Sequence, residues 1–442
     1  MKKLINMIAA LMLGTAMAGA QEAWTLDDCL SYAKEHNITL QKARLQKQSA
    51  EESVKSAQAM LLPSLSASTN QSVGYRPWQD NGTTTVTNGQ VNSKVEKSYY
   101  NGSYGLNASW TVWNGNKNHN TLKQNRLEAE KAGYDAETTA NSIQEQIAQL
   151  YVQILYLTEA VKVSEQSLET SRKNEERGQQ MLEVGKMSKA DLAQLSAQRA
   201  SDEYTIVESR ANISKYKLQL KQLLELDGGT TFDIVVPETT DEQALAAVPQ
   251  LQTVYNDALA SRPEVKGSNV AVKSSEVGIQ LAKAGWLPTL NMTGGLGTST
   301  NSLSNNSWGK QLKTNFDASA GLTLSIPIFD QRQARTAVNK ARIQREQALL
   351  DLQDTQKQLY QTIENYWLDA ETNQAKLRSA ITTEQSEQQS YDLLQEQFQL
   401  GLKNIVELMT GKDRLLTAQQ NRLQSKYQAI LALQMLKFYS GN

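Results

Sequence analysis

Cysteine, proline and long apolar runs are all scarce in this chain of 442 residues. The single cysteine, Cys29, excludes a disulfide bond within the chain. None of the 7 prolines lies between Pro77 and Pro237 or after Pro327, so long uninterrupted helices are permitted there. Beyond the leader, no apolar run reaches the roughly 18 residues of a membrane-spanning helix. Any contact with a membrane is therefore expected to involve structure other than a membrane-spanning helix.

Strong net charge and the usual catalytic groupings are also absent. The formal net charge is -1, and no basic patch favours a nucleic-acid partner. The two histidines, His36 and His119, have no acid or nucleophile arranged near them. Neither a phosphate-binding glycine loop nor a cluster of metal ligands is present. The sequence therefore predicts no enzyme activity, no cofactor, no metal site and no nucleic-acid binding.

The N-terminus has the features of a secretory signal peptide. Two lysines come first, the apolar run Leu4–Leu13 follows, and Ala18–Ala20 forms a small-residue cleavage site. A helical membrane anchor is the alternative, but this apolar run is too short to span a bilayer. We expect residues 1–20 to be removed near Ala20 and the mature protein to be exported. Cys29 follows two aspartates and is expected to be a half-buried thiol on a helix rather than a lipid attachment point.

An internal two-fold repeat covers the mature sequence. A shift of 225 residues places Pro63 on Pro288, and a shift of 216 residues places Gly185 on Gly401, with further identities around both. Repeats of this length decide the architecture, because each copy is one structural unit. The expected repeats are 21–226 and 249–442, joined by a linker at 227–248.

The sequence pattern predicts the same order of helices and strands in each repeat. Two helices lead to a Leu-Pro junction that disfavours further helix. A strand pair follows, and then a long helix and a return helix. The expected ranges are 63–113 and 288–329 for the strand pairs, 116–184 and 332–400 for the long helices, and 188–226 and 404–439 for the return helices.

Apolar and polar residues alternate within the strand pairs. In the first repeat Leu106, Trp110 and Val112 share one face, and serine, threonine and asparagine residues occupy the other. A sheet packed on a soluble core is an alternative, but no other apolar surface remains to cover this face. Lipid is the better partner, because a strand of about 10 residues crosses a bilayer with an apolar outer face and a wet inner face. Polar loops are expected at 81–101 and 298–313.

The long helices are the main feature of the sequence. At about 1.5 Å per residue, the 116–184 helix would be on the order of 100 Å long. Such a length suits a rod, a coiled coil or a tunnel wall rather than a globular core. Asn114 and Asp330 are suited to cap the helix starts, and Gly185 and Gly401 are suited to end the helices.

Four strands do not make a closed sheet, and lipid does not tolerate unpaired strand edges. Closure of a barrel needs about eight strands or more. Several copies therefore have to pool their strands under rotational symmetry. Four strands per chain give about eight in a dimer or about twelve in a trimer, and the sequence pattern alone leaves both open.

The order and duplication of these motifs resemble those of the TolC-type outer-membrane efflux proteins, over essentially the whole mature chain. The residues that carry the resemblance are 25–30 with Ala33 and Asn37, the two Leu-Pro junctions, 113–115, 328–330, and the turns 183–186 and 399–402. The resemblance implies a mostly helical fold with membrane β-structure. Long α-helical hairpins would form a periplasmic tunnel, and four strands per chain would enter a shared trimeric barrel of about twelve strands.

The same resemblance implies function and partners. It implies a passive homotrimeric exit duct in the outer membrane of a Gram-negative type cell, in contact with outer-membrane lipid and extending into the periplasm. The duct would serve a tripartite efflux or secretion system. Its tip would dock to a periplasmic adaptor of the membrane fusion type, which connects it to an inner-membrane transporter.

In that family the hairpin turns contact the adaptor, and charged side chains near the tip hold the entrance closed. The adaptor-contact candidates by position are Val184, Gly185, Lys186, Leu400, Gly401 and Leu402. The entrance-gate candidates are Asp191, Lys403 and Glu407. Lys403 replaces the family's arginine and Thr410 stands where a second acid is expected, so this gate departs from the family pattern. Asp191 and Glu407 also have capping-box spacing.

A secreted coiled-coil scaffold or adhesin without a pore is the alternative function. It would explain the long helices and apolar seams such as Ile206, Ile213 and Leu220. It would not explain two pairs of amphipathic strands at matching repeat positions.

Overall fold

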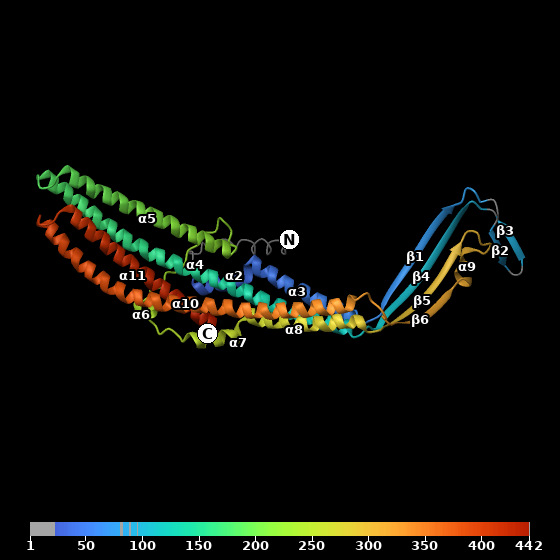
Figure 1. Cartoon of the computed structure of the whole chain (residues 1–442). Helices are drawn as coiled ribbons and strands as arrows, with labels where there is room; N and C mark the ends of the chain where they lie inside the picture. The colour runs from blue at the N-terminus through green and yellow to red at the C-terminus, as the bar shows by residue number, and fades with distance from the viewer. Residues whose placement is uncertain (1–22, 80–82, 88–89, 95, 442) are drawn as a thin grey trace, which may run out of the picture. The chain divides into compact units, whose positions relative to one another are not determined.

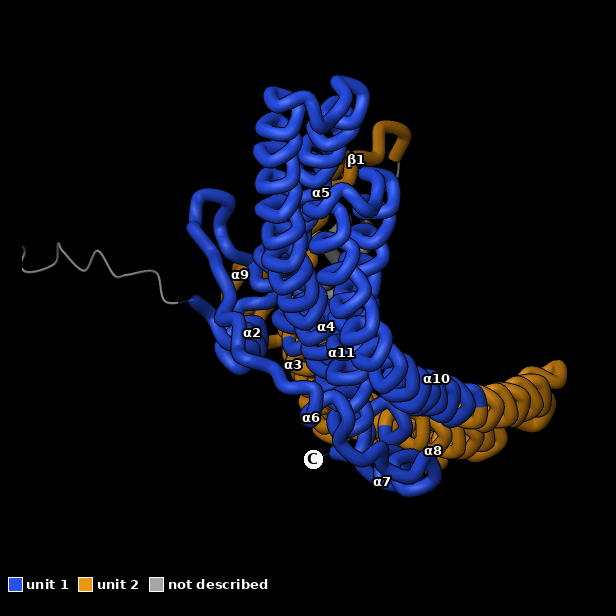
Figure 2. Tube along the Cα trace, turned by 90° about the vertical axis from the view of Figure 1, so that its left-hand side faces the viewer, with its two compact units in different colours: residues 1–44, 134–266, 354–442 blue, residues 45–133, 267–353 orange. Residues whose placement is uncertain are grey.

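The computed structural model describes residues 23–79, 83–87, 90–94 and 96–441 (Figure 1). The expected signal peptide, residues 1–20, lies outside the described residues. The chain divides into two compact units, which Figure 2 distinguishes by colour. Unit 1 comprises the residues up to Arg44, Tyr134–Lys266 and the residues from Asp354 onward, and unit 2 comprises Leu45–Gly133 and Gly267–Gln353. Within the described ranges, no helix combines the length and apolar character needed to cross a membrane.

Unit 2 contains a four-stranded antiparallel sheet in the order β1-β4-β5-β6. Its strands are β1 (Ser64–Tyr75), β4 (Ser98–Trp113), β5 (Thr289–Asn301) and β6 (Asp317–Ser325). The central pair, β4 with β5, joins the first repeat to the second. The outer strands β1 and β6 each pair on one side only within the described part of the chain.

The strand register gives this sheet one apolar and one polar face, as the alternation predicts. One row across the sheet is Ala67, Leu106, Leu296 and Ala318, and the adjacent row, on the opposite face, is Ser66, Asn107, Gly295 and Ser319. The apolar side chains stay exposed: Leu65 is 70% exposed and Leu322 is 69% exposed. A single chain therefore leaves this apolar face without a protein core to cover it.

Two segments expected to be irregular loops contain regular structure, so that expectation is wrong. β2 (Thr83–Thr87) and β3 (Gln90–Lys94) form an antiparallel pair inside 81–101. β5 continues to Asn301, and α9 (Trp308–Thr314) lies almost entirely within 298–313. Hydrogen bonds hold α9 against β5, because Gln311 accepts from the Asn301 N–H at 2.7 Å and Thr298 donates to the Leu312 carbonyl at 2.7 Å.

Two long helical hairpins make up most of the rest of the chain. They are α4 (Lys117–Glu183) with α5 (Lys189–Leu223), and α10 (Gln333–Gln399) with α11 (Ile405–Ser440). α4 and α10 have 67 residues each. The shorter helices are α2 (Leu26–His36), α3 (Ile38–Ala59), α6 (Asp241–Ala244), α7 (Leu251–Ser261), α8 (Pro263–Lys283) and the 3-10 turn Ala284–Trp286.

Both long helices begin after two consecutive residues with positive φ. These residues include Asn116 at φ 63° in the first repeat and Arg332 at φ 68° in the second. The expected starts at 116 and 332 are therefore one residue too early. The Asp330 carboxylate accepts the N–H groups of Arg332 at 3.0 Å and Ala334 at 2.7 Å, which satisfies donors at the helix start. Asn114 accepts the Asn118 N–H at 3.2 Å in the same way.

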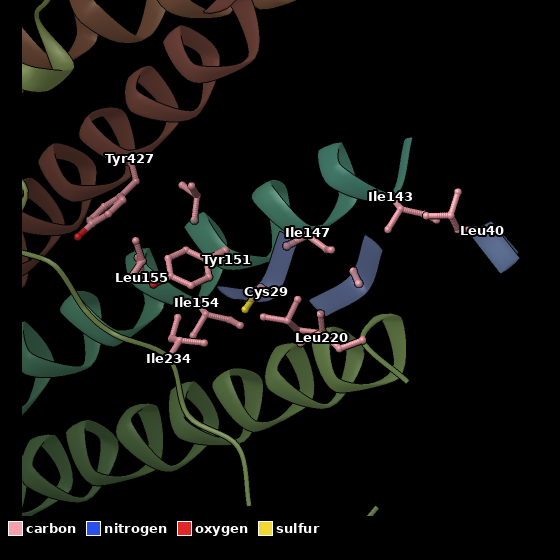
Figure 3. Close-up of a cluster of buried hydrophobic side chains, with 13 residues drawn as sticks. Cys29, Leu40, Ile143, Ile147, Tyr151, Ile154, Leu155, Leu220, Ile234 and Tyr427 are labelled. Carbon is pink, nitrogen blue, oxygen red and sulfur yellow. The ribbon is translucent and has the colours of Figure 1, made fainter. Parts of the chain in front are cut away.

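The main hydrophobic core of unit 1 gathers around Cys29 (Figure 3). α2 contributes Cys29, α4 contributes Ile147 and Ile154, and α5 contributes Leu220. Cys29 is fully buried rather than half-buried, because these side chains enclose its thiol. Burial, with a smaller contribution from the Asp28 charge, raises the pKa of the Cys29 thiol to about 12. The thiol is therefore neutral and unreactive near pH 7.

Part of the segment 227–248 is built into the same core. Ile234 packs among the core residues and forms a parallel β-bridge with Trp24. The Tyr151 hydroxyl donates to the Val235 carbonyl at 2.7 Å. This single bridge ties the linker to the beginning of the first repeat.

Candidate functional site at the hairpin turns

The first hairpin turn, between α4 and α5, ends α4 with a glycine in the left-handed region. Gly185 has φ 72°, and its N–H donates to the Leu182 carbonyl at 3.0 Å. The Lys186 N–H donates to the Met181 carbonyl at 2.8 Å. These two bonds form a Schellman motif, which satisfies carbonyls that the helix end leaves unpaired.

The second turn, between α10 and α11, repeats this geometry. Gly401 has φ 76°, its N–H donates to the Phe398 carbonyl at 3.0 Å, and the Leu402 N–H donates to the Gln397 carbonyl at 2.9 Å. No atom lies within 4 Å of the position that a Cβ would take at Gly185 or Gly401. Glycine is therefore required by backbone conformation rather than by close packing.

Large apolar side chains surround both turns and are exposed. Val184 is 68% exposed, Leu400 is 75% exposed and Leu402 is 71% exposed. Val406, in the first turn of α11, is 58% exposed. Apolar groups that gather at a helix turn without being covered are typical of a surface that binds another protein.

The three gate candidates all belong to the starts of the return helices. The Ser188 hydroxyl accepts the Asp191 N–H at 3.1 Å and donates to the Asp191 carboxylate at 2.8 Å, which caps α5. Among the described residues, Asp191 forms no ion pair. The structure of one chain therefore does not bring Asp191 together with Lys403 and Glu407.

Lys403 and Glu407 do contact each other. The Lys403 Nζ lies 2.6 Å from Glu407 Oε1, and Glu407 also completes a capping box with Asn404 at the start of α11. The hydrogen bond from Lys403, followed by that from the Asn404 N–H, holds the pKa of Glu407 below its usual value. Both residues are partly exposed, so this pair fixes the local geometry of the turn more than it stabilises the fold.

A buried ion pair that the sequence reading missed lies further along the same hairpins. Lys412 of α11 pairs with Asp202 of α5, and Ser171 of α4 donates to the same carboxylate at 2.6 Å. Lys412 is 5% exposed, Asp202 is 7% exposed and Ser171 is 3% exposed. Gln198 donates to the other Asp202 oxygen at 3.0 Å. The cluster ties the two hairpins together.

The sequence did contain a signal for this cluster. Lys412 follows Leu408 by four residues and precedes Leu415 by three, and both leucines are buried. A charged residue at such a seam position in a coiled coil is expected to have a buried partner. The partner on another helix cannot be found from spacing, because α5 and α11 are far apart in sequence.

The family model described as outer membrane efflux protein matches residues 29–225 and 254–442. The match covers both repeats, and the chain belongs to the outer membrane efflux protein family. The alternative of a secreted scaffold or adhesin has no support from this result.

Two relatives align along almost the whole chain. The outer membrane efflux protein BepC of Brucella suis biovar 1 is 22% identical over 426 residues, which are 96% of this chain and 87% of BepC. The outer membrane protein TolC of Vibrio cholerae serotype O1 is 21% identical over 442 residues, 99% of this chain and 95% of that protein. The crystal structure of the Campylobacter jejuni CmeC outer membrane channel matches with a TM-score of 0.77 and 19% identity, over 94% of this chain and 86% of CmeC. This last likeness shows the fold.

Proposed function

We propose that the protein is a passive trimeric exit duct of a tripartite efflux or secretion system. Family membership supports export across the outer membrane. The single observation that carries the rest is the sheet of unit 2, which has an exposed apolar face and two outer strands, β1 and β6, each with one unpaired edge among the described residues.

The unpaired edges of this sheet require more chains. Backbone groups at a strand edge have no water to bind in lipid, so each edge has to meet another strand. Four strands from each of three copies give a closed barrel of about twelve strands, with the apolar row of Leu106 and Leu296 toward lipid. The hydroxyl and amide side chains of the other face would then line the channel.

The exposed apolar turns support the adaptor-contact role. Val184, Leu400 and Leu402 would bind the periplasmic adaptor, while Gly185 and Gly401 set the turn geometry and Lys186 flanks the first turn. The adaptor would connect the duct to an inner-membrane transporter, which supplies the energy. The channel itself would carry out no chemical step.

We also propose the domain organisation that follows from the duplication. A signal peptide of residues 1–20 would be cleaved near Ala20. The repeats 21–226 and 249–442, joined by 227–248, would each supply one strand pair and one helical hairpin. Asp191, Lys403 and Glu407 would constrict the entrance once three copies bring their turns together.

Membrane fractionation of cells that express the full chain tests this function. The protein is expected in the outer membrane, as an oligomer that resists mild detergent and conducts ions across a planar lipid bilayer. A monomer in the soluble periplasmic fraction would contradict the proposal.

A photo-crosslinking residue in place of Leu402 tests the adaptor contact in a native host. We expect a crosslink to a periplasmic protein that is anchored in the inner membrane. The matched control is the same residue in place of Ile343, which is 59% exposed on α10 but far in sequence from the turns. Equal crosslinking at both positions, or none at Leu402, would argue against the tip as the docking site.

A further inference from the structure

An apolar cavity lies where the linker contacts helices α4 and α11. Its volume is about 300 Å³, and residues of α4, α11, the linker and the start of α2 line it. The buried side chains Tyr151, Val152, Leu155 and Tyr427 form its inner wall. Figure 3 shows Tyr151, Leu155 and Tyr427 grouped near the linker residue Ile234. All the lining residues belong to unit 1 of a single chain, so the cavity does not depend on oligomerisation.

The polar groups of the inner wall are already hydrogen-bonded. The Tyr151 hydroxyl donates to the Val235 carbonyl at 2.7 Å, and the Thr239 hydroxyl donates to the Tyr427 hydroxyl at 3.1 Å. Ile430 of α11 and the side chain of Val235 add further apolar surface. A ligand in this cavity is therefore held by apolar contact and needs no hydrogen bond at the inner wall.

The volume of the cavity limits the size of its ligand. An apolar cavity of about 150 Å³ stays dry and accommodates one benzene ring. Twice that volume suits an apolar body of about two fused rings. Small-molecule sites have volumes of about 300 to 1,000 Å³, so this cavity is at the small end of their range. A helix from a partner protein, about 10 to 12 Å across, is too wide to enter it.

The rim of the cavity carries a negative charge without an ionic partner. Among the described residues that line the cavity, Glu238 is the only charged one; it is exposed and forms no ion pair with the rest of the described chain. Arg422 and Lys426 of α11 contact the linker beside the cavity, but both already have acidic partners. Arg422 lies 2.6 Å from Asp241, and the Lys426 Nζ lies 3.8 Å from Glu159. The rim therefore attracts a cation and repels an anion.

We propose that this cavity binds a small amphiphilic amine. The apolar body of the ligand, about two rings in size, lies against Leu155 and Ile430, and its ammonium group lies at Glu238. The site uses neither the hairpin turns nor the polar face of the sheet, so it is distinct from the surfaces assigned to docking and to the channel wall. One chain supplies every lining residue, so the site exists whether or not the proposed duct forms.

Calorimetric titration of the full-length protein in detergent tests the site, with 1-naphthylmethylamine as the probe. We expect saturable binding after the heat from protein-free micelles is subtracted. Ile430→Trp fills the cavity and should abolish this binding. The matched control is Ile343→Trp, because Ile343 is exposed, belongs to unit 2 and does not line the cavity. Equal affinity in the two variants would overturn the site.

A second filled variant keeps the test valid if Ile430→Trp does not fold. Val235→Phe fills the cavity from the linker side and keeps the backbone carbonyl that accepts from Tyr151. The probe should raise the unfolding temperature of the wild type, because a ligand that binds only the folded state stabilises it. It should leave the unfolding temperature of Val235→Phe unchanged. An equal rise in both proteins would place the probe elsewhere and overturn the site.

Three probes of similar size test the role of Glu238: 1-naphthylmethylamine, the neutral 1-naphthalenemethanol and the anion 1-naphthoate. The wild type should bind the amine about 2- to 5-fold more tightly than the alcohol, and the anion most weakly. Glu238→Gln should remove the difference between amine and alcohol. Glu242→Gln should retain it, because Glu242 is an exposed glutamate of the linker outside the cavity lining. A preference for the alcohol or the anion in the wild type, or a preference for the amine that survives in Glu238→Gln, would overturn the ligand class.

Conductance measurements on the same preparations separate this site from the proposed duct. A protein that conducts ions across a lipid bilayer but binds none of the three probes would overturn the site and leave the duct intact. A protein that binds the amine in the predicted way but forms no conducting oligomer would contradict the duct and support the site.

Discussion

At the scale of single residues, Lys412, Asp202 and Ser171 are the most constrained polar groups near the hairpin turns. They are buried on three different helices, and each satisfies the others. Removal of either Lys412 or Asp202 leaves the other charge buried without an opposite charge. Replacement of both by apolar residues removes the cost of desolvating the two charges as well as the attraction between them. The cluster therefore holds the two hairpins in one alignment, and its contribution depends on both charges being present.

We predict that Asp202→Ala destabilises the folded protein by about 3–5 kcal/mol. The double variant Asp202→Leu with Lys412→Met should be close to the wild type, since no buried charge remains. Thermal unfolding of the purified protein in detergent, followed by circular dichroism, measures both. Equal losses of stability in the single and double variants would show that an unpaired buried charge is not the cause of the destabilisation.

The lowered pKa of Glu407 predicts that the order of the second turn depends on pH. Its pKa is lowered by Lys403 and by the Asn404 N–H from the ordinary value of 4.5. A lowered folded-state pKa means that the stabilisation is complete above the unfolded value and is lost as the pH falls through the folded value. The turn is therefore expected to stay ordered from neutral pH to about pH 4.5 and to loosen below it.

A spin label attached to Val406→Cys measures this loosening. Its mobility should rise only below about pH 4.5 in the parent, and Glu407→Gln should raise it at neutral pH and leave it independent of pH. Mobility that is independent of pH in the parent would contradict the role of the Lys403–Glu407 pair.

At the scale of helices and strands, the sequence predicts the regular elements well where capping residues mark their ends. Gly185, Gly401, the Ser188 N-cap and the capping box at Asn404 fix the hairpin turns through purely local hydrogen bonds. The β2-β3 pair was missed although the sequence has two threonine- or valine-containing runs separated by Asn88-Gly89, which is a hairpin signal. α9 could not be predicted, because contacts with β5 rather than its own composition support it.

The candidate site was predictable only in part, for a physical reason. The turn glycines follow from local backbone chemistry, so position along the chain identifies them. The exposed state of Leu400 and Leu402, and the burial of Lys412, depend on how four helices pack. The spacing of apolar residues shows which residues share a face of one helix. It does not show which other helix covers that face.

The starts of the long helices give a prediction at this scale. Asp330→Ala removes an acceptor for two N–H groups and should cost roughly 1 kcal/mol. Arg332→Gly should instead be neutral or stabilising by up to about 1 kcal/mol, because Arg332 has φ 68° and glycine adopts that conformation without strain. Thermal unfolding distinguishes the two variants. Destabilisation by Arg332→Gly as large as that by Asp330→Ala would contradict the strain at this position.

At the scale of the whole molecule, the sheet of one chain is incomplete in its edges and in its apolar face. The sheet of unit 2 has an exposed apolar face, and its outer strands β1 and β6 each pair on one side only in the described part of the chain. In the proposed duct, further copies of the same chain would pair these edges and lipid would cover the apolar face. The membership in the outer membrane efflux protein family accords with an assembly that spans a membrane.

Single-particle imaging of the complex extracted from the outer membrane tests the central claim most directly. A three-fold ring is predicted, with β1 of one copy paired to β6 of the next in a closed barrel of about twelve strands. A monomer, a dimer of about eight strands, or a ring in which β1 and β6 of neighbouring copies do not pair would contradict it.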